Sequence, residues 1–197
     1  MAVISIKNKT KSGSLLVGNA PFIPTDFESI ATVNGTGASA TITFSSIPAT
    51  YVALQIRLLS RADSGSGNNA VIGLQFNSDT GANYTRHQLR GDGSVVSAFG
   101  STGNTNAFVT SGSAGSGALA NAMGVSIIDI HDYASTTKNK TVRSLTGMDL
   151  NSVDGQILLT SSLWINTSAI NSISIIHPSG QTFSTTTVAS LYGIKGA

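Results

Sequence analysis

Residues 40–58 read Ala-Thr-Ile-Thr-Phe-Ser-Ser-Ile-Pro-Ala-Thr-Tyr-Val-Ala-Leu-Gln-Ile-Arg-Leu, and apolar side chains alternate with polar ones at both ends of this stretch. Alternation with a period of two predicts strands that have one buried and one solvated face. The same pattern returns between clusters of Gly, Ser, Asn and Thr from Phe27 almost to the C-terminus. The sequence therefore predicts an all-β protein.

Ten to twelve short strands are expected beyond residue 26, and helix patterns are poor apart from a possible turn of helix near residues 133–138. Short strands, frequent turns and no fixed-period repeat are typical of a jelly roll made of two sheets. We expect a jelly-roll-like antiparallel β-sandwich preceded by an extended N-terminal arm. The approximate strand ranges are 28–33, 40–46, 51–60, 70–77, 83–90, 94–99, 106–111, 121–131, 140–148, 156–165, 171–177 and 185–194.

The composition indicates one domain with a surface of few charges. No break in composition divides residues 27–197, so we expect a single β-sandwich domain there. Only 10% of the 197 residues are charged, against about 25% in a typical soluble domain. Hydroxyl and amide groups lose less than charges when they leave water, so such a surface suits permanent contact with other proteins. An ordinary secreted β-sandwich is the alternative.

Residues 1–26 form the predicted N-terminal anchoring arm. They hold three lysines and one acid, and therefore carry the whole formal charge of +2, while residues 27–197 are balanced. Two prolines in the segment favour an extended backbone. We expect the arm to lie on a neighbouring subunit and to add a strand to an exposed sheet edge, and an arm folded back on its own domain is the alternative. The anchoring residues are Lys7, Lys9, Lys11, Leu15, Leu16 and Val17.

Catalytic and metal-binding patterns are missing from the sequence. There is no cysteine, no Gly-x-Ser-x-Gly elbow and no phosphate-binding loop. The nearest approach to a site is Asp129-Ile130-His131-Asp132, where Asp129 and His131 would share one strand face. A closed metal site needs at least three ligands, so a polar strand end is favoured. We therefore expect no catalytic residue, no metal and no cofactor, and the sequence contains neither a nucleic-acid-binding pattern nor a membrane span.

The period of two also predicts which side chains point inward. Ile128 and Ile130 compete with Ile127 for the inward face, so that strand is expected to be buried on both sides or to lie in a subunit interface. Five side chains should face solvent or a neighbouring subunit: Thr41, Thr43, Gln55, Ser172 and Ser174. The predicted inward set is Ile42, Phe44, Leu54, Ile56, Leu58, Ile127, Leu159, Ile173 and Ile175.

Five segments spread over nearly the whole chain together resemble a widespread family of small tailed-bacteriophage structural proteins. The resemblance implies a virion component and brings no catalytic residues with it. The segments are residues 14–19 (Ser-Leu-Leu-Val-Gly-Asn), 27–33 (Phe-Glu-Ser-Ile-Ala-Thr-Val), 43–57 (Thr-Phe-Ser-Ser-Ile-Pro-Ala-Thr-Tyr-Val-Ala-Leu-Gln-Ile-Arg), 83–93 (Asn-Tyr-Thr-Arg-His-Gln-Leu-Arg-Gly-Asp-Gly) and 191–196 (Leu-Tyr-Gly-Ile-Lys-Gly).

We therefore expect a non-enzymatic phage virion protein that is assembled in the host cytoplasm. It would be anchored to other virion proteins through residues 1–26 and would self-associate, as a trimer or another symmetric oligomer. In a tail fibre or tail appendage, exposed loops would contact a host-surface glycan, with Tyr84, His87, Arg90 and Asp92 as a speculative contact group. Two alternatives remain open: a capsid decoration protein bound to the major capsid protein, and a free lectin or glycan hydrolase.

Overall fold

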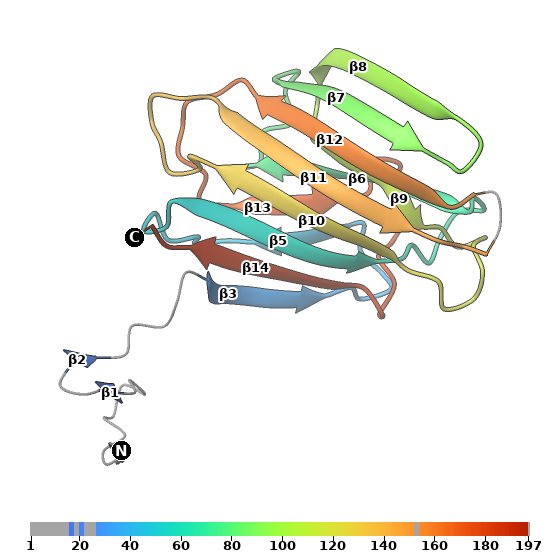
Figure 1. Ribbon diagram of the computed structural model, residues 1–197, viewed down its shortest axis with the longest axis horizontal. Coiled ribbons are helices and arrows are strands. Elements are labelled where there is room, and N and C mark those ends of the chain that lie inside the picture. The colour runs from blue at the N-terminus through green and yellow to red at the C-terminus, as the bar shows by residue number, and fades with distance from the viewer. Residues whose placement is uncertain (1–15, 18–19, 22–26, 152–153, 197) are drawn as a thin grey trace, which may run out of the picture.

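The computed structural model describes residues 16–17, 20–21, 27–151 and 154–196. These residues form strands, turns and loops without a helix, and the domain consists of two antiparallel sheets packed face to face (Figure 1). The predicted all-β sandwich is confirmed. No helix forms at residues 133–138, where a turn and bends follow β10 instead, so that expectation was wrong.

The large sheet has eight strands and faces the viewer in Figure 1. Its order is β3-β14-β5-β10-β11-β12-β7-β8, and every neighbouring pair is antiparallel. The strands are β3 (Phe27–Asn34), β5 (Ala53–Ser60), β7 (Tyr84–Gly91), β8 (Val96–Asn104), β10 (Gly124–His131), β11 (Lys140–Met148), β12 (Gln156–Trp164) and β14 (Val188–Ile194).

The small sheet lies behind the large one and has four strands in the order β4-β13-β6-β9. Eight strands, β4 to β9 with β12 and β13, follow the two Greek keys of a jelly roll, four in each sheet. The β10–β11 hairpin is inserted between β5 and β12, and β3 and β14 extend the edge beside β5. The strands of the small sheet are β4 (Thr41–Phe44), β6 (Asn69–Phe76), β9 (Ala107–Ala114) and β13 (Ile173–Ile176).

The main core lies between the two sheets and confirms most of the predicted inward positions. The alternation in β4 and β5 places one face of each strand in this core, as the sequence predicts. Thr41 and Thr43 are exposed. The predicted residues that are buried are Ile42, Phe44, Leu54, Ile56, Leu58, Ile173 and Ile175.

Two predicted core residues, Ile127 and Leu159, point the other way. They lie on the outer face of the large sheet and are 41% and 48% exposed, while Ile128 and Ile130 fill the core. Where β9 packs against it, the inner face of β10, β11 and β12 also carries buried hydroxyls beside its apolar side chains. Ser144 donates a hydrogen bond to the Val109 carbonyl at 2.7 Å, and Ser162 donates to the Phe108 carbonyl at 2.8 Å. Hydroxyls that satisfy these carbonyls replace the apolar side chains that the pattern led us to expect inside.

The anchoring arm lies largely outside the described residues. Lys7, Lys9, Lys11 and Leu15 are not among them. Leu16 and Val17 form β1 (Leu16–Val17), which pairs only with β2 (Ala20–Pro21) in a two-stranded sheet of its own.

Candidate functional site

The outer face of β5, β10, β11, β12, β7 and β8 carries aliphatic side chains in two adjacent rows. The first row runs Leu59, Val125, Gly147, Ile157, Gly91 and Val96 across neighbouring strands. The second runs Ile127, Leu145, Leu159 and Leu89. We call the eight exposed aliphatic side chains of these rows the apolar band: Leu59, Leu89, Val96, Val125, Ile127, Leu145, Ile157 and Leu159.

The area of the apolar band is large for a free protein surface. Each of its side chains is at least 38% exposed, and together they present on the order of 700 Å² to solvent. The largest apolar patch on a typical monomer measures roughly 300–600 Å². The band therefore has the extent of an interaction surface.

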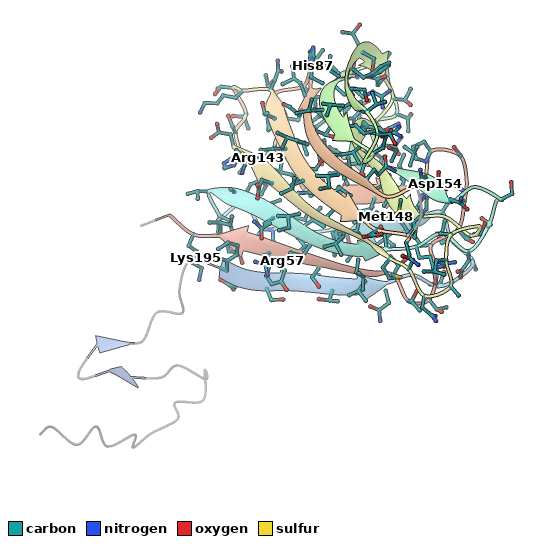
Figure 2. The ribbon with its side chains drawn as sticks, turned by 45° about the vertical axis from the view of Figure 1, so that its right-hand side comes forward. Arg57, His87, Arg143, Met148, Asp154 and Lys195 are labelled. Carbon is teal, nitrogen blue, oxygen red and sulfur yellow. The ribbon has the colours of Figure 1, made fainter. Side chains whose placement is uncertain are left out.

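A third row beside the band is polar and makes its own contacts. Arg143 forms an ion pair with Asp129 at 2.7 Å, and the Gln55 amide donates to the same carboxylate at 2.9 Å. Burial raises the pKa of Asp129, but the Arg143 and Gln55 hydrogen bonds and the arginine charge outweigh it, so the pKa lies below its usual value. Figure 2 labels Arg143 of this row, and also Arg57, which pairs with Ile127 and continues the second row onto β5. Continuing across the sheet, Arg143 is followed by Ser161 and then His87.

A groove of about 760 Å³ opens where the band meets this polar row. Leu89 and Leu159 supply its apolar wall, and His87, Arg143 and Ser161 lie along its polar side. Its lining is mainly apolar with a few polar groups on one side, which suits an apolar partner positioned by a few hydrogen bonds. Figure 2 shows His87 and Arg143 projecting from strands of the same sheet.

The four proposed glycan-contact residues do not form a surface group. Tyr84 is buried and stacks on Trp164, with ring centroids 6.4 Å apart. Arg90 and Asp92 pair with each other at 3.1 Å. Asp92 also accepts the backbone N–H groups of Ser94 and Val95 in the turn between β7 and β8. His87 alone lies on the groove.

The carboxylates of the Asp129–Asp132 segment are each paired with a cation. Asp129 binds Arg143, and Asp132 binds Lys138 at 2.9 Å. Among the described residues, no three His, Cys, Asp or Glu side chains are grouped so that they could hold a metal ion. The described ranges also contain no helix that could span a membrane.

The apolar band is the feature of the site that sequence reasoning placed wrongly. Ile127 and Leu159 were assigned to the core, although a competing inward pair, Ile128 and Ile130, signalled that β10 has two apolar faces. In β11 and β12 Ser and Thr alternate with aliphatic residues, and this pattern ordinarily predicts that the aliphatic side chains are buried, so the two strands gave no local signal of the observed reversal.

Comparison of the chain with protein-family models, with curated proteins and with solved structures finds no match. The functional assignment therefore depends on the geometry of the outer face and on the sequence resemblance described above.

Proposed function

We propose that this chain is a non-enzymatic structural subunit of a bacteriophage particle, displayed on its surface as part of a tail fibre or tail appendage. It self-associates in a symmetric oligomer and attaches to other virion proteins through residues 1–26. The apolar band is the observation that carries this proposal.

An apolar band of this size is costly when it faces water and stabilising when it is covered. Burial of apolar surface contributes roughly 25 cal/mol per Å², and association must also overcome the loss of translational and rotational freedom. In a subunit that is held permanently in an assembly, the band stays covered and its burial offsets the cost of association. The low charge of the chain supports the same role, because 10% charged residues leave few ions to desolvate at contacts between subunits.

The polar groups beside the band are arranged as structural contacts. Asp129 is engaged by Arg143 and Gln55, which satisfies its carboxylate on the protomer itself. Such pairing holds the rim of an interface without requiring a ligand. The resemblance to small tailed-phage structural proteins supplies the kind of assembly that we propose.

The experiment is to locate the chain on purified particles with antibodies against residues 27–197, and to count copies by quantitative mass spectrometry. A handful of copies at the tail supports a tail appendage, whereas hundreds of copies on the shell would replace it with capsid decoration. When particles are assembled with a chain that lacks residues 1–26, that truncated chain should be absent from the purified particles. Full occupancy by the truncated chain would contradict anchoring through the arm.

A further inference from the structure

Two glycines on the outer face have no explanation within the protomer. Gly91 and Gly147 lie on β7 and β11, and a Cβ added to either would meet no atom within 4 Å. Neither has a positive φ. Other strand glycines have a local cause: a Cβ at Gly112 would meet Thr146 at 3.0 Å, and one at Gly193 would strike the Tyr51 ring. Glycine inside a strand weakens it and often marks a bulge, a tight bend, or a site where a ligand or another backbone approaches closely.

The two glycines flank the most exposed aliphatic side chain of β12. Ile157 pairs with Gly147 on one side and with Gly91 on the other, and it is 66% exposed. A hollow of about 590 Å³ is lined by these three residues and the adjoining turns. Ile157 therefore projects between two positions that lack side chains.

We propose that the apolar band binds the same band of a second copy of this chain, about a two-fold axis that runs along the strands between β11 and β12. This inference rests on the proposed function, since it names the partner of the surface described there. The rotation places β11 of one protomer over β12 of its partner, and β10 over β7.

This axis places a large side chain opposite a glycine at both central positions of the first row. Ile157 of one protomer meets Gly147 of its partner, and Val125 meets Gly91, following the strand order and register. Shape complementarity of this kind gives an interface the packing density of a protein interior. The two glycines then provide the space for the partner's side chains.

The other two rows are also complementary across the axis. In the second row Leu145 meets Leu159, so apolar surface covers apolar surface. In the third row Asp129 of one protomer lies opposite His87 of its partner, which places an acid near a side chain that can donate a hydrogen bond. Two rows of aliphatic contacts with a polar rim on one side follow the usual arrangement of a protein interface.

The area of the band matches what a stable dimer requires. The band exposes on the order of 700 Å² on each protomer, and a standard interface buries about 800 Å² per partner. The described surface offers no second aliphatic patch of this size to receive the band, since only six other large hydrophobics are exposed and one of them, Val95, adjoins Val96 of the band itself: Phe27, Val52, Val95, Phe99, Leu119 and Ile165. The self-complementary contact requires two-fold symmetry.

The test measures the association of the full chain by sedimentation equilibrium, for four proteins. Gly147→Ile fills the hollow without a clash inside the protomer. The double variant Gly147→Ile with Ile157→Gly exchanges the large and small positions and restores the fit across the axis. Thr32→Ile places an isoleucine at an exposed position on the outer face of β3, two strands beyond the band, and is the control.

We expect the wild type, the double variant and Thr32→Ile to be dimers. Gly147→Ile should associate at least about 30-fold more weakly, because the clash occurs twice in the dimer. Thermal unfolding and circular dichroism of Gly147→Ile at low concentration should show a folded protomer. If it does not fold, the double variant still decides the question, because a dimer there requires the exchanged fit.

Three results would overturn the inference. A wild-type protomer that stays monomeric would mean that the arm or another virion protein covers the band. A trimer would be consistent with the proposed function but would exclude the two-fold pairing. A Gly147→Ile variant that associates as tightly as the wild type would place the contact elsewhere. If the wild type is a dimer but the antibodies do not label particles, this inference stands and the proposed function is contradicted.

Discussion

The indole Nε1 of Trp164 donates a hydrogen bond to Oδ2 of Asp79 at 2.7 Å, and this contact joins the end of β12 to the turn between β6 and β7. Trp164 is buried, and Asp79 also accepts from the Gly81 backbone N–H and the Asn83 amide. The hydroxyl of Tyr84 donates to the Asp79 carbonyl. One short acidic side chain therefore satisfies several donors in the turn beside the core.

Asp79→Ala should lower the free energy of unfolding by about 1 to 3 kcal/mol, because it leaves a buried indole N–H without an acceptor. Asp79→Asn should lower the free energy of unfolding less, because its amide oxygen can still accept the indole hydrogen bond. Urea titration at pH 7 measures both. If Asp79→Ala matches the wild type, water satisfies the indole and the contact does not stabilise the turn.

The same carboxylate gives stability a dependence on acidity. The Trp164 hydrogen bond, opposed by burial and aided by Asn83 and Gly81, lowers the pKa of Asp79. The ionised form is therefore favoured by folding, and the stability it contributes is complete above the unfolded pKa of about 3.9. It is lost as the pH falls through the lower folded pKa. The difference in the free energy of unfolding between the wild type and Asp79→Asn should therefore become smaller below pH 4.

His177 should make the fold sensitive to a milder change in pH. Its Nδ1–H donates to the Val71 carbonyl at 2.8 Å, its ring packs on Phe183, and its Nε2 is buried without a partner. Burial lowers the pKa of His177, and the Val71 hydrogen bond only partly opposes this. The neutral ring is therefore the folded form, and stability should fall as the pH drops below about 6.5, where the unfolded chain takes up a proton.

Urea titrations at pH 7.5 and pH 5.5 measure this effect against His177→Gln, which keeps an amide donor but does not titrate. The wild type should lose more stability than the variant between the two pH values. An equal loss in both proteins would assign the pH dependence to other groups.

Arg61 should hold the loop after β9 in place. Its guanidinium donates to the carbonyls of Leu119 and Ala122 at 3.0 Å and of Ala118 at 3.4 Å. A lysine cannot reproduce these bonds because it lacks the planar fork of donors. Arg61→Lys should therefore speed amide hydrogen exchange in residues 115–123 and leave β10 and β11 unchanged. Unchanged exchange in the loop would show that its backbone contacts with residues 67 and 68 suffice.

Neighbouring isoleucines of β10 test the assignment of the two sheet faces. Ile128 is fully buried, so Ile128→Ala should cost about 2 to 5 kcal/mol. Ile127→Ala should change the stability of an isolated protomer far less, because that side chain is 41% exposed. Both variants are best measured in the Gly147→Ile background at low concentration, where association does not contribute. Equal losses would contradict the assignment of Ile127 to the outer face.

The alternation of residues predicted the fold better than it predicted the site. All twelve strands expected beyond residue 26 are present, because turns and the period of two are local properties of the chain. In β12 the local sequence does not determine which face of the strand is buried: Leu158 is buried and Leu159 is exposed. Close packing of β9 decides it, since Gly112 brings that strand within reach of the hydroxyls opposite. A single strand's pattern does not reveal which sheet will pack against it.

Long-range contacts also explain why the proposed contact group failed. Tyr84 and His87 were assigned to one contact group, but their side chains lie on opposite faces of β7. Tyr84 packs on Phe76 and Trp164, which come from two different strands. The exposed partners of His87 are likewise supplied by neighbouring strands, because Ser161 and Gly100 flank it in the sheet.

Self-association through the apolar band is tested most directly by placing a charge at its centre and measuring the mass in solution. Leu145 is 54% exposed in the protomer, so Leu145→Asp should leave the fold intact while making the band unable to lose its water. Sedimentation equilibrium should give an oligomeric mass for the wild type and for Thr32→Asp, whose charge lies on β3 outside the band, and the protomer mass of 20.1 kDa for Leu145→Asp. A wild type that sediments at the protomer mass, or a Leu145→Asp variant that remains oligomeric, would contradict the account.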